Sequence, residues 1–172
     1  MSRLGLFIAL TDAERDRLLA ATSDDERLDI VQAIESEWDP SRIVETDKAW
    51  YPIHLALSGR RVLSDPDHDP ATYPLDHVIM GARSLYGKGD PEKDAWVIRL
   101  NDPKVIADIA RAFETVTVEQ MRALYDKGAA IEPDVQCGDE DFDFAMEYLE
   151  PVKELFAREA KTGRWIVFSA DR

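Results

Sequence analysis

The chain has 172 residues, 45% of them hydrophobic, which is enough for one hydrophobic core and too little for two domains of ordinary size. Its formal net charge of −14 argues against nucleic acid or an anionic membrane as a partner, because both bind through basic patches. A single cysteine, Cys137, excludes an internal disulfide and favours a reducing compartment. We therefore expect one cytoplasmic domain, 1–172, whose large partners are basic proteins.

The amino-terminal apolar run, residues 4–10, ends in charged residues without a small-residue cleavage site, so it predicts a buried strand and not a signal peptide. No other run approaches the roughly 18 apolar residues that a membrane-spanning helix needs. The sequence therefore predicts a soluble protein.

The hydrophobic periodicity predicts a small sheet of about three strands covered by six or seven helices, an α+β (α/β-type) domain. The strands are expected at residues 3–10, 95–100 and 165–169. The helices are expected at about 12–21, 24–37, 75–80, 103–113, 118–128 and 142–160, with a further helix within 47–59 whose start Pro52 leaves open.

Capping residues mark several of the helix ends. Thr11 with Glu14, Ser23 with Glu26, and Thr117 with Gln120 have the spacing of capping boxes, in which a hydroxyl and a carboxylate or amide serve free backbone N–H groups. Pro151 lies inside the last predicted helix, where it should kink the helix or split it in two.

The segment 47–59 is apolar on nearly every side of a helix that Gly59 should end. Trp50, His54 and Ser58 follow one another at one-turn spacing, and a histidine in this setting can act as a general base or a ligand. The alternative is a buried histidine whose ring bonds to a carbonyl or a hydroxyl. The loop at 60–74 would complete a pocket beside this helix.

Residues 132–154 contain nine carboxylates and one lysine, a local net charge of −8 out of −14 for the whole chain. Aromatic residues are interleaved among them, and an acidic face with an aromatic edge would suit a basic protein partner. The simpler interpretation is a solvated helix face. The predicted interaction surface consists of Asp139, Glu140, Asp141, Asp143 and Glu147.

Two further patterns are weaker. Asp65, Asp67 and Asp69 imitate the start of a calcium loop, but Pro70 replaces the required glycine, so a solvated loop is the better interpretation and no metal site is predicted. Cys137 matches no local signature of a cysteine enzyme, so no catalytic residue and no cofactor are predicted.

The Gly-Leu-Phe strand, the run from Asp47 to Trp50 that leads to His54, and the Val-Ile-Met-Gly run at 78–81 together resemble the YfbM-like family. The resemblance extends over the whole chain. It implies a bacterial, cytoplasmic, single-domain fold and supplies no catalytic residues.

From these residues we expect a non-enzymatic binding protein that uses its acidic face toward a basic protein partner. The alternative is a small-ligand binder or enzyme with a pocket near Trp50, His54 and the 60–74 loop.

Overall fold

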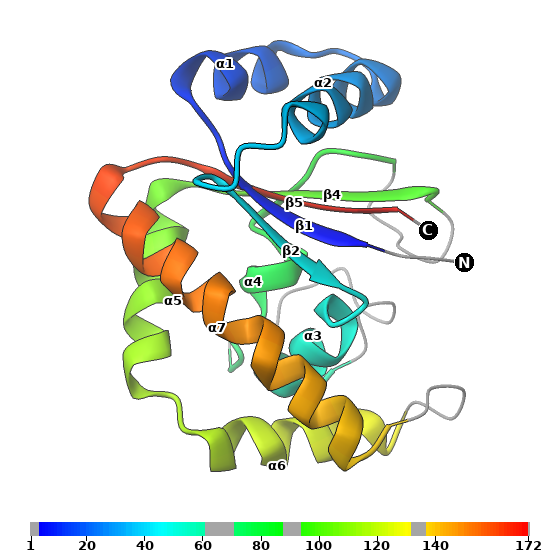
Figure 1. The fold of residues 1–172 in the computed structure, drawn as a ribbon, viewed down its shortest axis with the longest axis vertical. Helices are drawn as coiled ribbons and strands as arrows, with labels where there is room; N and C mark the ends of the chain where they lie inside the picture. Colours follow the sequence, from blue (N-terminus) through cyan, green and yellow to red (C-terminus); the bar gives the residue numbers. More distant parts are fainter. Residues whose placement is uncertain (1–3, 61–70, 88–93, 132–136, 172) are drawn as a thin grey trace.

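The computed structural model describes residues 4–60, 71–87, 94–131 and 137–171, and an antiparallel five-stranded sheet lies at its centre (Figure 1). The strands occur in the order β2-β1-β5-β4-β3, so the first and last strands of the chain are neighbours and Phe7 lies opposite Phe168. The strands are β1 (Gly5–Ala9), β2 (Ile43–Asp47), β3 (Arg83–Ser84), β4 (Trp96–Asn101) and β5 (Ile166–Asp171).

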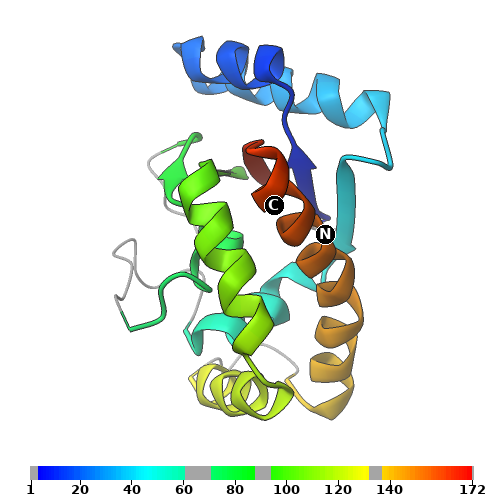
Figure 2. The ribbon, with the colours of Figure 1, turned by 90° about the vertical axis from the view of Figure 1, so that its left-hand side faces the viewer.

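Helices cover both faces of the sheet, so the domain has three layers (Figures 1 and 2). Two helices lie over one face, α1 (Asp12–Ala20) and α2 (Asp24–Glu37). The other five described helices lie on the opposite side: α3 (Trp50–Ser58), α4 (His77–Met80), α5 (Pro103–Thr115), α6 (Val118–Ala129) and α7 (Asp139–Thr162). The α+β class and the number of helices agree with the prediction from the sequence.

The prediction of about three strands is wrong, because β2 and β3 were missed. β2 is an edge strand whose residues Val44, Glu45 and Asp47 are not fully buried, so the segment lacks the apolar run that marks an interior strand. β3 has only two residues, both exposed, and is a strand only because it pairs with β4. The local sequence of β3 therefore carries no strand signal, and that of β2 only its β-branched residues.

The three predicted strands are the interior ones. Their successive side chains point to opposite faces of the sheet and so contribute to two hydrophobic cores. Phe7 and Phe168 contribute to the core beneath α3 and α7, with ring centroids 4.9 Å apart. Ile8 and Val167 point to the other face and pack under α1 and α2. Because both faces of these strands are buried, their sequences are continuous apolar runs.

The helix ends follow the predicted caps with one difference. Thr11 and Thr117 form complete capping boxes with Glu14 and Gln120. Ser23 accepts from the N–H of Glu26 at 3.2 Å, but the Glu26 carboxylate accepts from the Thr22 N–H instead of returning to Ser23. That reciprocal half of the predicted box is therefore wrong.

Pro151 does not split the last helix, because α7 runs unbroken for 24 residues. A proline removes one intrahelical bond, here to the carbonyl of Glu147, and both residues lie on the exposed side of the helix. Leu149 and Val152 on the opposite side are fully buried and keep the helix against the core.

The helix α3 starts beside the first strand in very close contact. A Cβ atom at Gly5 would lie 2.8 Å from Cδ1 of Trp50 and 2.6 Å from Oγ1 of Thr46. Thr46 also donates to the Gly5 carbonyl at 2.9 Å. Only a glycine lets β1, β2 and α3 meet at this point.

In the described residues, no helix is long and apolar enough to cross a membrane.

Candidate functional site

The predicted interaction surface lies at the start of α7. Asp139, Glu140, Asp143 and Glu147 are exposed, whereas Asp141 is only partly exposed. The first turn of a helix favours carboxylates because they face the positive end of the helix dipole. Asp139, Glu140 and Asp141 in that turn therefore stabilise the helix.

Two of these five carboxylates are bound by α6. Arg122 pairs with Asp139 at 2.7 Å and with Asp126 at 2.9 Å, and its guanidinium lies 5.1 Å from the centroid of the Phe142 ring. Tyr125 donates to Asp141 Oδ2 at 2.6 Å. Asp139 and Asp141 are thus mainly engaged within the protein, and they fix the beginning of α7 against α6.

The other carboxylates continue along the exposed side of α7 and form what we call the acidic stripe. Its spacing of three and four residues places every member on one face of the helix. The acidic stripe consists of Glu140, Asp143, Glu147, Glu150 and Glu154, all exposed. Lys153 pairs with Glu150 at 2.8 Å, and the other four form no ion pair within the described residues.

Apolar surface borders the acidic stripe. Phe144 and Tyr148 are partly buried with ring centroids 4.8 Å apart. Phe144 also lines a shallow hollow of ≈ 580 Å³, together with Cys137, Gly138, Asp139, Glu140 and Asp141. This end of α7 therefore combines carboxylates with an aromatic edge.

The three residues predicted as a ligand site on α3 are all buried. Trp50 is 3% exposed and packs against Phe168 with ring centroids 5.8 Å apart, so it is part of the core. His54 is 3% exposed and Ser58 is 1% exposed. The structure places all three along one helix, as the spacing predicted. Most of the loop predicted to complete the pocket, residues 61–70, lies outside the described residues.

The hydroxyl of Ser58 connects the histidine to the helix backbone. Its Oγ lies 2.8 Å from the His54 carbonyl oxygen and 3.1 Å from His54 Nε2. With the single hydroxyl proton assigned to the shorter contact, Nε2 is the protonated ring nitrogen and donates to Ser58. This is the geometry of a buried histidine held by a hydroxyl.

A second group of buried polar residues was not predicted. Asp76 and His77 at α4 are 4% and 7% exposed, and His77 Nδ1 lies 2.7 Å from Asp76 Oδ1. Asn101 of β4 donates to the His77 carbonyl at 2.8 Å. Arg99, two residues earlier on β4, is 8% exposed, and burial lowers the pKa of its guanidinium while the charge of Asp94 opposes that shift.

Buried ionisable groups of this kind occur often at functional sites. The sequence offered only a weak signal for them, an arginine inside an apolar strand and an Asp-His pair after a proline-rich loop. These residues come together only because α4 packs against β4, and local sequence patterns do not encode that packing.

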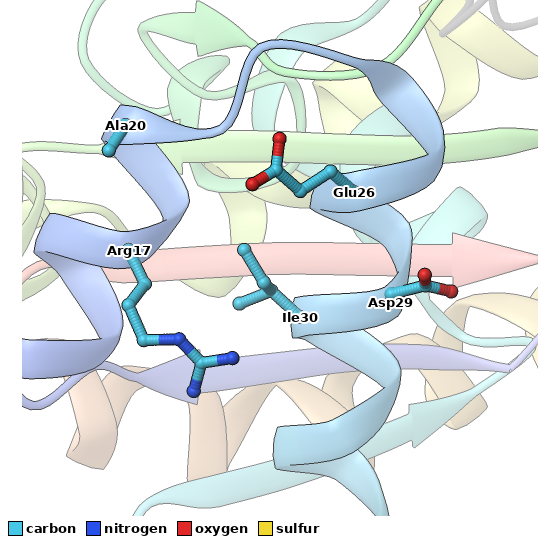
Figure 3. Close-up of a pocket in the computed structure, with 5 residues that line it drawn as sticks. All are labelled: Arg17, Ala20, Glu26, Asp29 and Ile30. Atoms are coloured by element: carbon cyan, nitrogen blue, oxygen red, sulfur yellow. The ribbon is translucent and has the colours of Figure 1, made fainter.

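A further hollow of ≈ 350 Å³ lies between α1 and α2 (Figure 3). Arg17 and Ala20 line it from α1, and Glu26, Asp29 and Ile30 line it from α2. Figure 3 shows Arg17 extending toward Ile30, with the Glu26 carboxylate on the opposite wall. Sequence patterns gave no indication of this hollow.

The aspartates at 65–69 lie outside the described residues. Among the residues that the structure does describe, no three His, Cys, Asp or Glu side chains are arranged to hold a metal ion.

Comparison with known proteins supports the family resemblance. The sequence matches the domain of unknown function DUF1877 over residues 1–169. The fold is similar to the crystal structure of YfbM from Escherichia coli, a protein of unknown function, with a TM-score of 0.71 and 19% sequence identity. That match covers 97% of this chain and 99% of YfbM. No curated protein sequence matches. The chain therefore belongs to the YfbM-like family of proteins that carry the DUF1877 domain.

Proposed function

We propose that this protein is a non-enzymatic binding protein of the bacterial cytoplasm that presents the acidic stripe of α7 to a basic protein partner. The supporting observation is that Glu140, Asp143, Glu147 and Glu154 are exposed on one helix face without an ion pair among the described residues. Fields of one sign steer an oppositely charged partner and fix its orientation.

The helix dipole explains only part of this arrangement. The effect of the dipole falls off within the first turn of the helix. It therefore does not favour the carboxylates of Glu147, Glu150 and Glu154, which lie beyond that turn. Like charges at this spacing repel one another by a few tenths of a kcal/mol per pair. A partner that brings cations to the acidic stripe would relieve that repulsion, and the aromatic edge at Phe144 and Tyr148 would add apolar contact.

The test compares pull-downs from the native cell with the wild type and two triple variants. Glu140→Gln, Asp143→Asn and Glu147→Gln remove three charges from the acidic stripe and leave Asp139 and Asp141 in place. The matched control removes three exposed charges elsewhere, with Asp25→Asn, Glu37→Gln and Glu114→Gln.

The proposal requires that the first triple variant lose a protein that the wild type and the control both retain. For that protein, the association rate should fall by about tenfold or more in the stripe variant and should fall with added salt in the wild type. Recovery of the same proteins by all three forms would show that the acidic stripe is not a recognition surface.

A second candidate function is a small-ligand binder or enzyme with a pocket near Trp50, His54, Ser58 and the 60–74 loop. The observation that favours it is the buried Asp76–His77 pair, which follows that loop directly. A thermal-shift screen of small metabolites against the wild type, His77→Gln and His54→Gln tests it. A compound that raises the melting temperature of the wild type but not of the variants would support this function. Equal shifts in all three forms would place the ligand elsewhere.

A further inference from the structure

The carboxyl group of Glu35 is enclosed between α2 and the sheet. Its Oε1 atom is fully buried, as is the hydroxyl oxygen of Ser169 on β5, and neither makes a well-formed hydrogen bond among the described residues. The two groups act on each other only through a weak side-chain contact. A buried carboxylate without strong donors is costly, whereas a protonated carboxyl group is far less so.

The surroundings of Glu35 also disfavour its charged form. Glu35 lies in the last turn of α2, where the negative end of the helix dipole repels an anion and no basic residue compensates. Burial, the largest effect, raises the pKa of Glu35 above its ordinary value of 4.5. The Ser169 hydroxyl lowers the pKa, and the charge of Asp171 raises it.

No cation from the neighbouring elements acts on Glu35 in the described residues. On this face of the sheet, β1 presents Leu6 and Ile8, and β4 presents Trp96 and Ile98. β5 presents Ser169 and Asp171. Three further charged groups lie on the adjoining elements. Glu45 on β2 and Glu37 on α2 are exposed, and Arg17 on α1 lines the hollow between α1 and α2.

We propose that the buried carboxyl group of Glu35 is a pH-sensitive latch: the α1–α2 layer stays on the sheet while Glu35 is protonated and loosens when Glu35 ionises without a strong donor to its carboxylate. These two helices are the only described ones on their face, so loosening them uncovers Ile8, Leu10 and the apolar side chains of β4 and β5 (Figure 1). The latch is separate from α7 and does not depend on the function proposed for the acidic stripe.

The direction of the effect follows from linkage. A carboxyl group whose pKa is higher in the folded state stabilises that state fully at a pH below its unfolded-state pKa. This stabilisation is lost as the pH rises through the folded-state pKa. The α1–α2 layer should therefore open more readily as the pH rises above 4.5. The other layer, built from α3 to α7, should not follow.

Hydrogen exchange measured by mass spectrometry between pH 5 and 8, corrected for intrinsic exchange rates, tests the latch on the full chain. In the wild type, protection of α1 and α2 should fall severalfold across this range while protection of α7 stays constant. Glu35→Gln keeps the shape but cannot ionise, so its α1–α2 protection should be high and independent of pH. Glu37→Gln, which removes an exposed charge from the same turn, should behave as the wild type.

A second variant keeps the test decisive if Glu35→Gln folds poorly. Ser169→Ala removes the group that favours the ionised form, so the pH at which protection falls should move upward. The latch is overturned if α1–α2 protection in the wild type does not change with pH. It is equally overturned if Glu35→Gln retains the wild-type pH dependence, or if Ser169→Ala moves the transition downward.

Discussion

The hydroxyl of Tyr125 on α6 donates to Oδ2 of Asp141 on α7 at 2.6 Å and accepts from the N–H of Gly138 at 3.1 Å. Tyr125 is 1% exposed, so this hydroxyl satisfies both groups at the boundary of the core. Burial, together with the hydrogen bond to Asp141, raises the pKa of Tyr125 well above its usual range. One of the five predicted interaction residues therefore has a structural role.

Tyr125→Phe removes the hydroxyl and leaves the ring in place. We expect a loss of about 1–3 kcal/mol in the free energy of unfolding, because Asp141 and the Gly138 N–H each lose a partner. Denaturant unfolding at pH 7 measures this change. An unchanged midpoint would show that the hydroxyl does not hold α7 in place. Tyr148→Phe is the control, because the Tyr148 hydroxyl makes no hydrogen bond within the described residues.

Arg42 binds the Glu14 carboxylate through both Nη atoms, at 2.7 Å and 3.2 Å, and also donates to the Ala9 carbonyl. Burial alone would raise the pKa of Glu14, but hydrogen bonds from the Thr11 N–H and from Arg42 outweigh it and lower the pKa below 4.5. Because the pKa of Glu14 is lower in the folded state, this stabilisation is present above pH 4.5. It is lost as the pH falls through the folded-state pKa.

Glu14→Gln should lower the free energy of unfolding by about 1–3 kcal/mol at pH 7, because it removes a charge-assisted pair with little exposure. The difference from the wild type should shrink as the pH falls below 4, where the wild-type carboxylate takes up a proton. Unfolding curves measured between pH 2.5 and 7 check this. A difference that does not depend on pH would contradict the ionic contribution.

Gly5→Ala introduces a methyl group that collides with Trp50 and Thr46. Relief of this collision must move α3 or β2, so we expect a loss of about 1–3 kcal/mol, measured by thermal or denaturant unfolding. Gly138→Ala is the control, because a Cβ there meets nothing within 4 Å and its φ of 174 is open to any residue. Equal effects of the two substitutions would disprove the close contact.

Ser58 and Ser36 offer a matched comparison of buried and exposed hydroxyls. Each lies within hydrogen-bond distance of the carbonyl four residues earlier, 2.8 Å to His54 and 2.7 Å to Gln32. Ser58→Ala also removes the partner of buried His54 Nε2, so it should cost about 1–3 kcal/mol, whereas exposed Ser36→Ala should change stability by less than about 0.5 kcal/mol. Similar values for both would mean that the His54 contact contributes nothing to stability.

The sequence identified the elements whose signals are local. α2 begins and ends at the predicted residues, and the three interior strands were found because burial on both faces leaves a continuous apolar run. The edge strand β3 was missed because only its pairing with β4 makes it a strand, and β2 was missed because its partly exposed residues break the apolar run. Pro151 is a similar case. The local rule predicted a kink or a break, but packing against the core keeps α7 continuous.

For the candidate sites, the sequence alone located the concentration of carboxylates on α7 and the one-turn spacing of Trp50, His54 and Ser58, since both depend only on composition and helical period. Which carboxylates remain available was decided by the tertiary structure, because α6 brings Arg122 and Tyr125 to Asp139 and Asp141. The Glu35–Ser169 contact and the Asp76–His77 group against β4 also arise only on folding. Interactions between residues far apart in the chain depend on how layers pack, and a local pattern carries no record of that packing.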